Sequence, residues 1–243
     1  MKKGEIRIGT SGWKYKHWNN TFYPTEVKGD AQLAYYTTLF NTVELNNSFY
    51  RQPSISNFLH WKEAVPKDFS YAVKANRFFT HMKNLKVEPN DVNDFIDKVN
   101  HLGEKLGPIL FQLPPSWKIN LDRLAYFLNL LPKGYRYVFE FRNATWYNKE
   151  INELLASKNV AFCIYELDGH LSPLTITADF VYIRLHGPGA KYQGSYQDKD
   201  LETWVTFIRQ QANAGKDVFV YFDNDQAGYA AFNAKRLKDL LNR

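Results

Sequence analysis

Cysteine is almost absent from this sequence, because Cys163 is the single example among 243 residues. One cysteine cannot form a disulfide within the chain. Cys163 also lies in an apolar segment, residues 160–165, whereas a reactive thiolate needs a cationic and accessible setting. We therefore expect a buried thiol without a chemical role.

Long apolar runs are absent as well. No stretch approaches the roughly 18 apolar residues that a membrane span needs. Lys2 and Lys3 lie near the N-terminus, but no apolar run of signal-peptide length follows them. We expect a cytoplasmic protein that has no membrane partner.

The sequence also lacks a long basic run, although its formal net charge is +6. That charge permits a polyanionic partner without requiring one. A phosphate-cradling glycine fingerprint is missing after the first predicted strand, and no pair of histidines has metal-ligand spacing. His186, Glu44, Glu140 and Asp223 do not make a recognisable metal set either. We expect neither a metal nor another cofactor.

The sequence does contain a strand with two distinct faces, in residues 137–143. Side chains of a strand alternate between its faces. The first face carries Tyr137, Phe139 and Phe141, and the second carries Val138, Glu140 and Arg142. The aromatic face can pack under covering helices. A face that begins apolar and ends in charged groups is typical of a strand in a (β/α)8 barrel, whose active site lies at the C-terminal ends of the strands.

Eight such strands alternate with helical patterns along the chain. The strands are predicted at Ile6–Gly9, Thr42–Asn46, Ser70–Ala75, Ile109–Leu113, Tyr137–Asn143, Val160–Tyr165, Phe180–His186 and Val218–Phe222. Residues 167–179, after the sixth strand, contain Gly169 and Pro173 and no helical stripe, so we expect that helix to be reduced or missing. Alternation and length together favour a single TIM-barrel domain over residues 1–243, in preference to an open doubly wound sheet.

Polar side chains occupy the inward face near the C-terminal ends of the predicted strands. The catalytic candidates are Glu44, Lys74, Glu140, Arg142 and His186, and the substrate-binding candidates on the strands are Asn46, Gln112, Glu166 and Arg184. Because this end of a barrel carries the chemistry, we predict that these groups converge on one pocket. The alternative is a buried ion-pair network that only plugs the barrel, but buried ion pairs stabilise weakly compared with apolar packing.

Roles follow from residue type. Glu44 and Glu140 are candidate general acids or bases. Lys74, Arg142 and Arg184 are candidates for holding an anion, and arginine can grip a phosphate or carboxylate with paired hydrogen bonds. His186 can move a proton near neutral pH, or it can be a hydrogen-bonded structural residue.

Aromatic residues are frequent in the loops after the strands. The candidates for stacking on a substrate are Trp13, Tyr50, Trp146 and Tyr196. Any one of these rings can equally be a packing residue. Together, beside arginines, they favour a ligand that is both anionic and aromatic, or a saccharide.

Seven motifs occur in order along nearly the whole chain. They are GTSGW from Gly9, VELNNSFYRQP from Val43, YAVKANR from Tyr71, FQLPPSW from Phe111, FEFRNATW from Phe139, ADFVYIRLHG from Ala178 with GSY after it, and YFDNDQAGYAAFNAKRL from Tyr221. Together they resemble the DUF72 family, the proteins related to bacterial YecE. The resemblance implies a (β/α)8 barrel without an established activity.

The resemblance also implies site residues. It adds Asn224 to the strand-end set, and it leads us to expect an aspartate where this sequence has Glu166. The family's barrel has a distant similarity to the endonuclease IV type, which suggests nucleic-acid binding. The metal-ligand histidines of that enzyme have no counterparts in this sequence, so its zinc mechanism does not carry over.

These observations predict an enzyme of hydrolase or lyase type that acts on a phosphorylated or nucleotide-like substrate by metal-independent acid and base chemistry. A noncatalytic nucleic-acid-binding barrel is the second hypothesis. A glycosidase is the third, because two carboxylates that flank a bond are its minimal apparatus. The expected partner is an anionic small molecule, a nucleotide or a nucleic acid, and the oligomeric state stays open.

Overall fold

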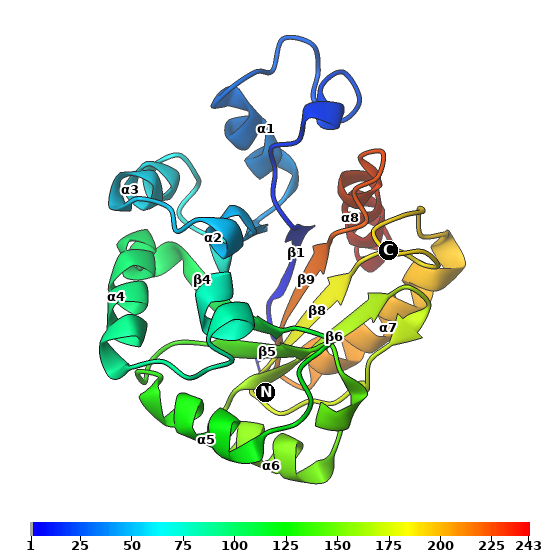
Figure 1. Cartoon of the computed structure of the whole chain (residues 1–243). Helices are drawn as coiled ribbons and strands as arrows, with labels where there is room; N and C mark the ends of the chain where they lie inside the picture. Colours follow the sequence, from blue (N-terminus) through cyan, green and yellow to red (C-terminus); the bar gives the residue numbers. More distant parts are fainter. Residues whose placement is uncertain (1) are drawn as a thin grey trace. The chain divides into compact units, whose positions relative to one another are not determined.

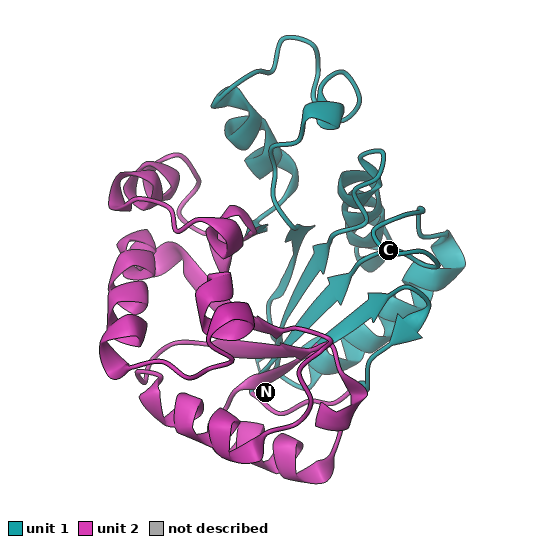
Figure 2. Ribbon diagram, viewed as in Figure 1, with its two compact units in different colours: residues 1–44, 164–174, 179–243 teal, residues 45–163, 175–178 magenta. Residues whose placement is uncertain are grey.

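The computed structural model describes residues 2–243, which fall into two compact units (Figure 2). Of these residues, unit 1 comprises 2–44, Ile164–Leu174 and Asp179–Arg243, and unit 2 comprises Leu45–Cys163 and Thr175–Ala178. That both units make one domain over residues 1–243 stays a prediction.

The strands of the described residues belong to one hydrogen-bonded sheet. They are β1 (Ile6–Thr10), β2 (Thr42–Leu45), β3 (Ser70–Lys74), β4 (Leu106–Leu113), β5 (Tyr137–Phe141), β6 (Ala161–Leu167), β7 (His170–Leu171), β8 (Phe180–Leu185) and β9 (Asp217–Phe222). Their order is β1-β9-β8-β6-β5-β4-β3-β2, and β7 pairs with β6 outside this path. The pairs β1 with β9, β9 with β8, β6 with β5, β5 with β4 and β4 with β3 are parallel.

The first and last strands of this order meet inside unit 1. Ser11 and Glu44 form a parallel bridge, and the backbone N of Gly12 donates a 2.8 Å hydrogen bond to the carbonyl of Glu44. Gly9 permits this approach, because a Cβ at this position would lie 2.1 Å from the carbonyl oxygen of Thr42. The strand order is therefore that of a (β/α)8 TIM barrel, as the sequence predicted.

Helices separate most of the consecutive strands (Figure 1). They are α1 (Ala31–Leu39), α2 (Asn47–Tyr50), α3 (Ile55–Glu63), α4 (Pro89–Val99), α5 (Leu121–Leu130), α6 (Lys149–Ser157), α7 (Asp198–Asn213) and α8 (Tyr229–Leu241), with short helical turns η1 (Lys16–Trp18), η2 (Phe78–Met82), η3 (Asn100–Lys105) and η4 (Ala144–Trp146). Within residues 2–243, none of the helices has the length and apolar character needed to traverse a bilayer.

Aromatic packing builds the core of unit 2. Phe139 of β5 stacks on Phe111 of β4 with ring centroids 5.3 Å apart, and Phe127 of α5 meets Phe111 at 5.0 Å. Phe95 of α4 packs against the same ring at 6.3 Å. The aromatic face of β5 thus lies under the helices, as its alternation predicted. In unit 1, α7 and α8 pack against β9.

Side-chain caps fix where several helices begin. Ser54, Asn120 and Asn148 each accept a hydrogen bond from a backbone N in the first turn of α3, α5 and α6, respectively. Asp30 precedes α1 without a side-chain cap, although an aspartate at this position is a common helix cap.

A hairpin takes the place of a helix after β6. β6 and β7 pair antiparallel, with Glu166 opposite Leu171 and Leu167 opposite His170. The turn is Asp168 and Gly169, whose φ values of 56° and 71° are the positive pair that a tight I′-type hairpin requires. The predicted loss of the helix between residues 167 and 179 is confirmed.

Candidate functional site

A buried carboxylate lies at the C-terminal end of β2 in unit 1. Glu44 is fully buried and accepts hydrogen bonds from the Ser11 hydroxyl at 2.6 Å and the Tyr182 hydroxyl at 2.6 Å. Arg184 Nη2 donates to Glu44 Oε1 at 2.8 Å, and Arg184 Nε lies 3.0 Å from Oε2. Burial and the charge of Glu44 raise the pKa of Tyr182 well above its ordinary value, so this phenol stays a hydrogen-bond donor.

Arg184 links Glu44 to a second carboxylate, both directly and by way of His186. Arg184 Nη2 donates to Asp223 Oδ2 at 3.2 Å, and Arg184 Nη1 lies 3.2 Å from His186 Nε2. His186 Nδ1 lies 3.0 Å from Asp223 Oδ2. A guanidinium can only donate, so Nε2 accepts and the proton of a neutral imidazole is on Nδ1, the ring nitrogen that lies 3.0 Å from Asp223 Oδ2. Glu44, Arg184, His186 and Asp223 form what we call the unit 1 network.

The sequence explains how the unit 1 network assembles. Tyr182 and Arg184 are two residues apart and therefore lie on the same face of β8. His186 follows directly after that strand. Arg184 pairs in register with Tyr221 of β9, so Asp223 emerges just beyond the same level. Parallel strands bring their C-terminal ends together. The network therefore stands where the fold class places chemistry.

Loop aromatics and a third carboxylate lie beside the unit 1 network. Tyr192 packs edge-on against His186 at 5.3 Å between ring centroids. Asp225 accepts a 2.6 Å hydrogen bond from Trp18 Nε1 and lies 2.9 Å from His17 Nε2. Burial raises the pKa of Asp225 to about 6, although these partners oppose the shift.

Trp13, Asn224 and Tyr196 have structural contacts in unit 1. The Trp13 carbonyl accepts a hydrogen bond from the Tyr23 hydroxyl. Asn224 Nδ2 donates to the Asn233 side chain at 2.8 Å, and the Tyr196 hydroxyl accepts from the backbone N of Gly187 at 3.1 Å. Asn224 and Tyr196 are buried and anchor the loop after β8.

Glu166 is placed apart from the unit 1 network. It lines a cavity with residues of α7, and its carboxylate accepts hydrogen bonds from Tyr196 and Trp204. Tyr165, its neighbour in β6, is the residue whose ring packs against His186, at 6.4 Å. Because neighbours along a strand face opposite sides, the inward orientation expected for Glu166 is wrong.

Unit 2 carries its own buried ion pair. Glu140 of β5 is fully buried and accepts a hydrogen bond from Arg142 Nε, whose side chain is 6% exposed. Cys163 Sγ donates to Glu140 Oε2 at 3.6 Å. Gln112 is the register partner of Glu140 on β4. Cys163 is buried as expected, and its thiol has a polar partner that the sequence did not indicate.

Lys74 and Asn46 lie near the helical turn that follows β2. Lys74 Nζ is 4.4 Å from the centroid of the Phe49 ring, and the Lys74 carbonyl accepts from the Ser48 hydroxyl at 2.6 Å. Asn46 precedes α2, and its carbonyl accepts from the backbone N of Phe49. Tyr50, at the end of α2, is 74% exposed.

A positive potential surrounds this part of unit 2. His81 packs edge-on against Phe49 at 5.0 Å. Burial lowers the pKa of His81, and the charges of Lys74 and Arg77 lower it further. The charges of Lys74 and Arg77 therefore both act on the region around His81, and they favour the binding of an anion there.

Trp146 is a correction to the expected aromatic rim. It is fully buried, stacks on Phe141 at 5.0 Å, and donates from Nε1 to the Trp117 carbonyl at 2.8 Å. In this position the ring supports the loop after β5 and has no face for a ligand. Of the predicted stacking residues, Tyr50 has the exposed ring that the prediction requires.

The sequence reasoning missed Ser11, Tyr182 and Asp223 as partners in the unit 1 network. Asp223 directly follows a buried strand in the motif YFDND, and that position was the available signal. Tyr182 has the same parity as Arg184 along β8. Ser11 lies in a loop, and a hydroxyl there gives no signal by itself.

Metal ligation is not indicated by side-chain geometry. Among residues 2–243, no group of three or more His, Cys, Asp or Glu side chains is arranged to hold a metal ion. The expectation that neither a metal nor another cofactor is bound stays a prediction.

The fold and this network define a class of protein: a TIM barrel with buried acid, base and guanidinium groups at the C-terminal ends of its strands. The family model described as "Protein of unknown function DUF72" matches residues 7–243. The chain therefore belongs to the DUF72 family, as its motifs suggested.

Relatives agree with this assignment. The UPF0759 protein YunF of Bacillus subtilis is 26% identical over 98% of this chain and 95% of its own length. The UPF0759 protein YecE of Escherichia coli K12 is 28% identical over 59% of this chain and 51% of its own length.

Solved structures agree on the fold. A DUF72 family protein from Thermotoga maritima is similar with a TM-score of 0.89 and 28% identity, covering 98% of this chain and 100% of that one. A second, from Enterococcus faecalis, has a TM-score of 0.81 at 20% identity and covers 100% of both chains, which shows the fold alone.

Proposed function

We propose that this protein is an enzyme that acts on a phosphorylated or nucleotide-like substrate by acid and base chemistry of its own side chains. The unit 1 network is the observation that supports the proposal. Buried charges are costly and contribute little stability compared with an apolar core. A stability role therefore explains the network poorly, whereas perturbed charged clusters are common at sites of chemistry.

His186 is the proton-transfer group in this proposal. Nε2 of His186 lies 3.2 Å from Arg184 Nη1, and because a guanidinium can only donate, the lone pair of Nε2 accepts from Nη1. An anionic substrate that binds the guanidinium would compete for Nη1 and release that lone pair. Substrate binding and activation of the base would then be the same event. Glu44, engaged by Ser11, Tyr182 and Arg184, serves to hold the guanidinium in place.

The preference for an anion rests on unit 2. Burial lowers the pKa of His81, and the charges of Lys74 and Arg77 lower it further, as nearby positive charges do. Arg142 contributes a guanidinium held by Glu140. Arginine and lysine near one another are suited to phosphate. Glu140 and Lys74 keep their proposed roles as acid, base or anion ligand.

A turnover screen tests the proposal. The panel consists of nucleoside monophosphates, sugar phosphates and the unphosphorylated counterpart of each, with and without EDTA, followed by mass spectrometry. We expect turnover of a phosphorylated compound, none of its counterpart, and no effect of the chelator. His186→Gln should then lower kcat by about 10²–10⁴-fold, the usual contribution of general acid–base catalysis.

His60→Gln is the matched control, because His60 is an exposed histidine of α3. It should leave kcat unchanged. Circular dichroism of both variants separates lost chemistry from lost folding. Equal kcat for His186→Gln and the wild type would refute the role of His186, and a panel without any turnover would refute the substrate class.

Noncatalytic nucleic-acid binding is the second candidate. Tyr50 favours it, because this ring is largely exposed and is followed by Arg51 in the loop after β2. A stacking ring beside a cation is the usual pairing for a single strand.

A further inference from the structure

A cavity of about 230 Å³ lies within unit 1, between the β6–β7 hairpin and α7. It is lined by Glu166, Leu171, Leu174, Pro188, Asp200, Thr203, Trp204 and Phe207. In a regular barrel, the connection after β6 would carry a covering helix. The hairpin and the loop after it replace that helix, which accounts for the space beside α7.

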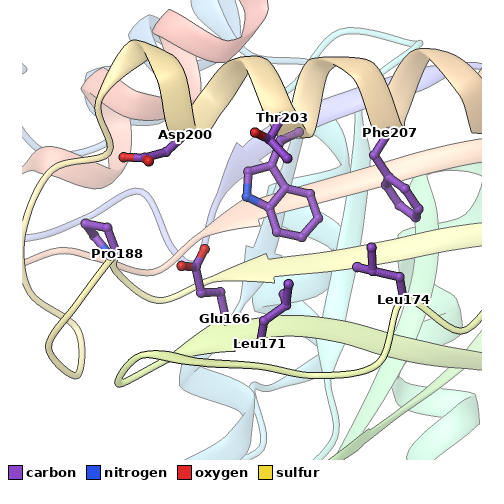
Figure 3. Close-up of a pocket in the computed structure, with 8 residues that line it drawn as sticks. Glu166, Leu171, Leu174, Pro188, Asp200, Thr203 and Phe207 are labelled. Atoms are coloured by element: carbon purple, nitrogen blue, oxygen red, sulfur yellow. The ribbon is translucent and has the colours of Figure 1, made fainter.

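The cavity has an acidic end and an apolar end (Figure 3). Figure 3 shows Glu166 and Asp200 near Pro188, and Phe207 and Leu174 together at the opposite side. Asp200, Thr203 and Phe207 are spaced i, i+3 and i+7, so one face of α7 supplies the upper wall. Leu171 and Leu174 are about half exposed, so the cavity is accessible from solvent along the hairpin.

At the acidic end, hydrogen bonds hold the carboxylates of Glu166 and Asp200 in fixed positions. Tyr196 and Trp204 both donate hydrogen bonds to Glu166, and the Tyr196 hydroxyl is itself bound by the backbone N of Gly187 at 3.1 Å. Asp200 accepts from the backbone N of Gln197 at 3.1 Å, which fixes it in the first turn of α7. Both acceptors are therefore oriented before any ligand arrives.

The electrostatics of this end favour a cation. Burial raises the pKa of Glu166, and the charge of Asp200 raises it further, against the two hydrogen bonds. A second carboxylate, that of Asp200, thus adds to the effect of burial on Glu166. A positive charge between them would offset both the desolvation and the repulsion.

We propose that this cavity binds a small organic cation, with an ammonium group between Glu166 and Asp200 and a flat apolar body against Trp204 and Phe207. Charge-assisted hydrogen bonds to the carboxylates would hold the head group, and the indole would contribute cation–π attraction. The volume is below the roughly 300–1,000 Å³ of sites for drug-sized ligands. The ligand is therefore about the size of an arylalkylamine.

This site does not rest on the proposed function, because its lining residues differ from those of the unit 1 network. The ligand of the cavity is a cation, whereas the substrate of the proposed function is an anion. The two proposals therefore fail or succeed separately.

Phenethylamine is the probe that tests the site, with 2-phenylethanol and 3-phenylpropionate as neutral and anionic counterparts. Isothermal titration calorimetry of the full chain measures the three dissociation constants. We expect phenethylamine to bind at least 10-fold more tightly than the alcohol and the carboxylate not to bind. NMR of the Trp204 indole N–H should show a shift on addition of the amine.

Glu166→Gln removes the charge that would hold the head group while nearly keeping the shape of the side chain. It should abolish the preference for the amine over the alcohol. Glu202→Gln, which removes a charge from an exposed position of the same helix, is the control and should preserve that preference. Thr203→Trp fills the cavity and should prevent binding of both compounds.

Equal affinity of the amine and the alcohol for the wild type would overturn the proposal. Retention of the preference in Glu166→Gln, or of binding in Thr203→Trp, would overturn it as well. Melting temperatures of the variants establish that each is folded.

Discussion

Arg184 contacts both carboxylate oxygens of Glu44, through Nη2 at 2.8 Å and Nε at 3.0 Å, and neither side chain is exposed. Such a pair is favourable only while both partners are present. Removing one charge leaves the other without its buried counterpart.

Glu44→Gln should therefore lower the free energy of unfolding by roughly 3–5 kcal/mol, the usual cost of breaking a buried pair. Urea denaturation measures the change. Glu5→Gln is the control, because Glu5 pairs with Arg7 at 2.8 Å while half exposed, and such pairs contribute about 0–1 kcal/mol. Similar losses for both variants would contradict the importance of burial at Glu44.

Asp225 should make the stability of the folded protein depend on pH in a defined direction. Burial raises its pKa from 3.8 to about 6, so the folded protein binds this proton more tightly than the unfolded chain does. The carboxyl therefore contributes stability below about pH 4, and that contribution is lost as the pH rises through about 6. Wild type should lose stability relative to Asp225→Asn over this interval.

Two measurements check this behaviour. Urea unfolding of wild type and Asp225→Asn between pH 4 and 7 gives the difference in stability, with Asp94→Asn on the exposed side of α4 as the control. NMR of the Trp18 indole N–H, which donates to Asp225 Oδ1 at 2.6 Å, should titrate with a midpoint near 6. A midpoint near 4 would show that burial does not raise the pKa.

Gly9 is expected to tolerate no side chain. A Cβ would lie 2.1 Å from the Thr42 carbonyl oxygen and 2.9 Å from the Tyr36 hydroxyl, and the first of these atoms is backbone. Gly9→Ala should therefore cost about 1–3 kcal/mol or more in the free energy of unfolding, because β1 and β2 must separate.

Gly189→Ala is the matched control for Gly9→Ala. No heavy atom lies within 4 Å of a Cβ at Gly189, and its φ is outside the left-handed region. Chemical denaturation should show a change within about 0.5 kcal/mol, as for ordinary surface positions. A tolerated Gly9→Ala would mean that the strands can move apart at low cost.

The strand pattern was predictable because it depends on local alternation. Tyr182 and Arg184 face the same way for the same reason that Glu140 and Arg142 do, and the sequence shows that parity directly. The C-terminal position of these residues then places them at the functional end of the fold. Whether the residues of unit 1 and those of unit 2 share one pocket stays a prediction.

Loop positions were less predictable, because they depend on packing between distant segments. Trp146 is buried by Phe141 and Trp117, which no periodic pattern announces. Glu166 was assigned to the inward face, although it directly follows Tyr165 in β6, which extends to Leu167, and neighbours along a strand face opposite sides. Asp168 and Gly169 were a recognisable hairpin signal, but residues 167–179 were interpreted only as the loss of a helix, from Gly169, Pro173 and the missing helical stripe.

The nucleic-acid hypothesis makes a prediction that separates electrostatics from stacking. A groove that contacts four phosphates of a single strand should show log affinity falling with log salt at a slope of about −0.7 per contact, roughly −3 in all. Tyr50→Ala should weaken binding by about 1–3 kcal/mol if a base stacks on this ring.

Tyr126→Ala is the matched control, since Tyr126 is 45% exposed on α5 in the same unit. Fluorescence anisotropy of a labelled oligonucleotide at several salt concentrations measures both effects. Binding that is absent at low salt, or that is equally affected by the two variants, would remove the nucleic-acid hypothesis and leave the net charge of +6 as a solvated surface.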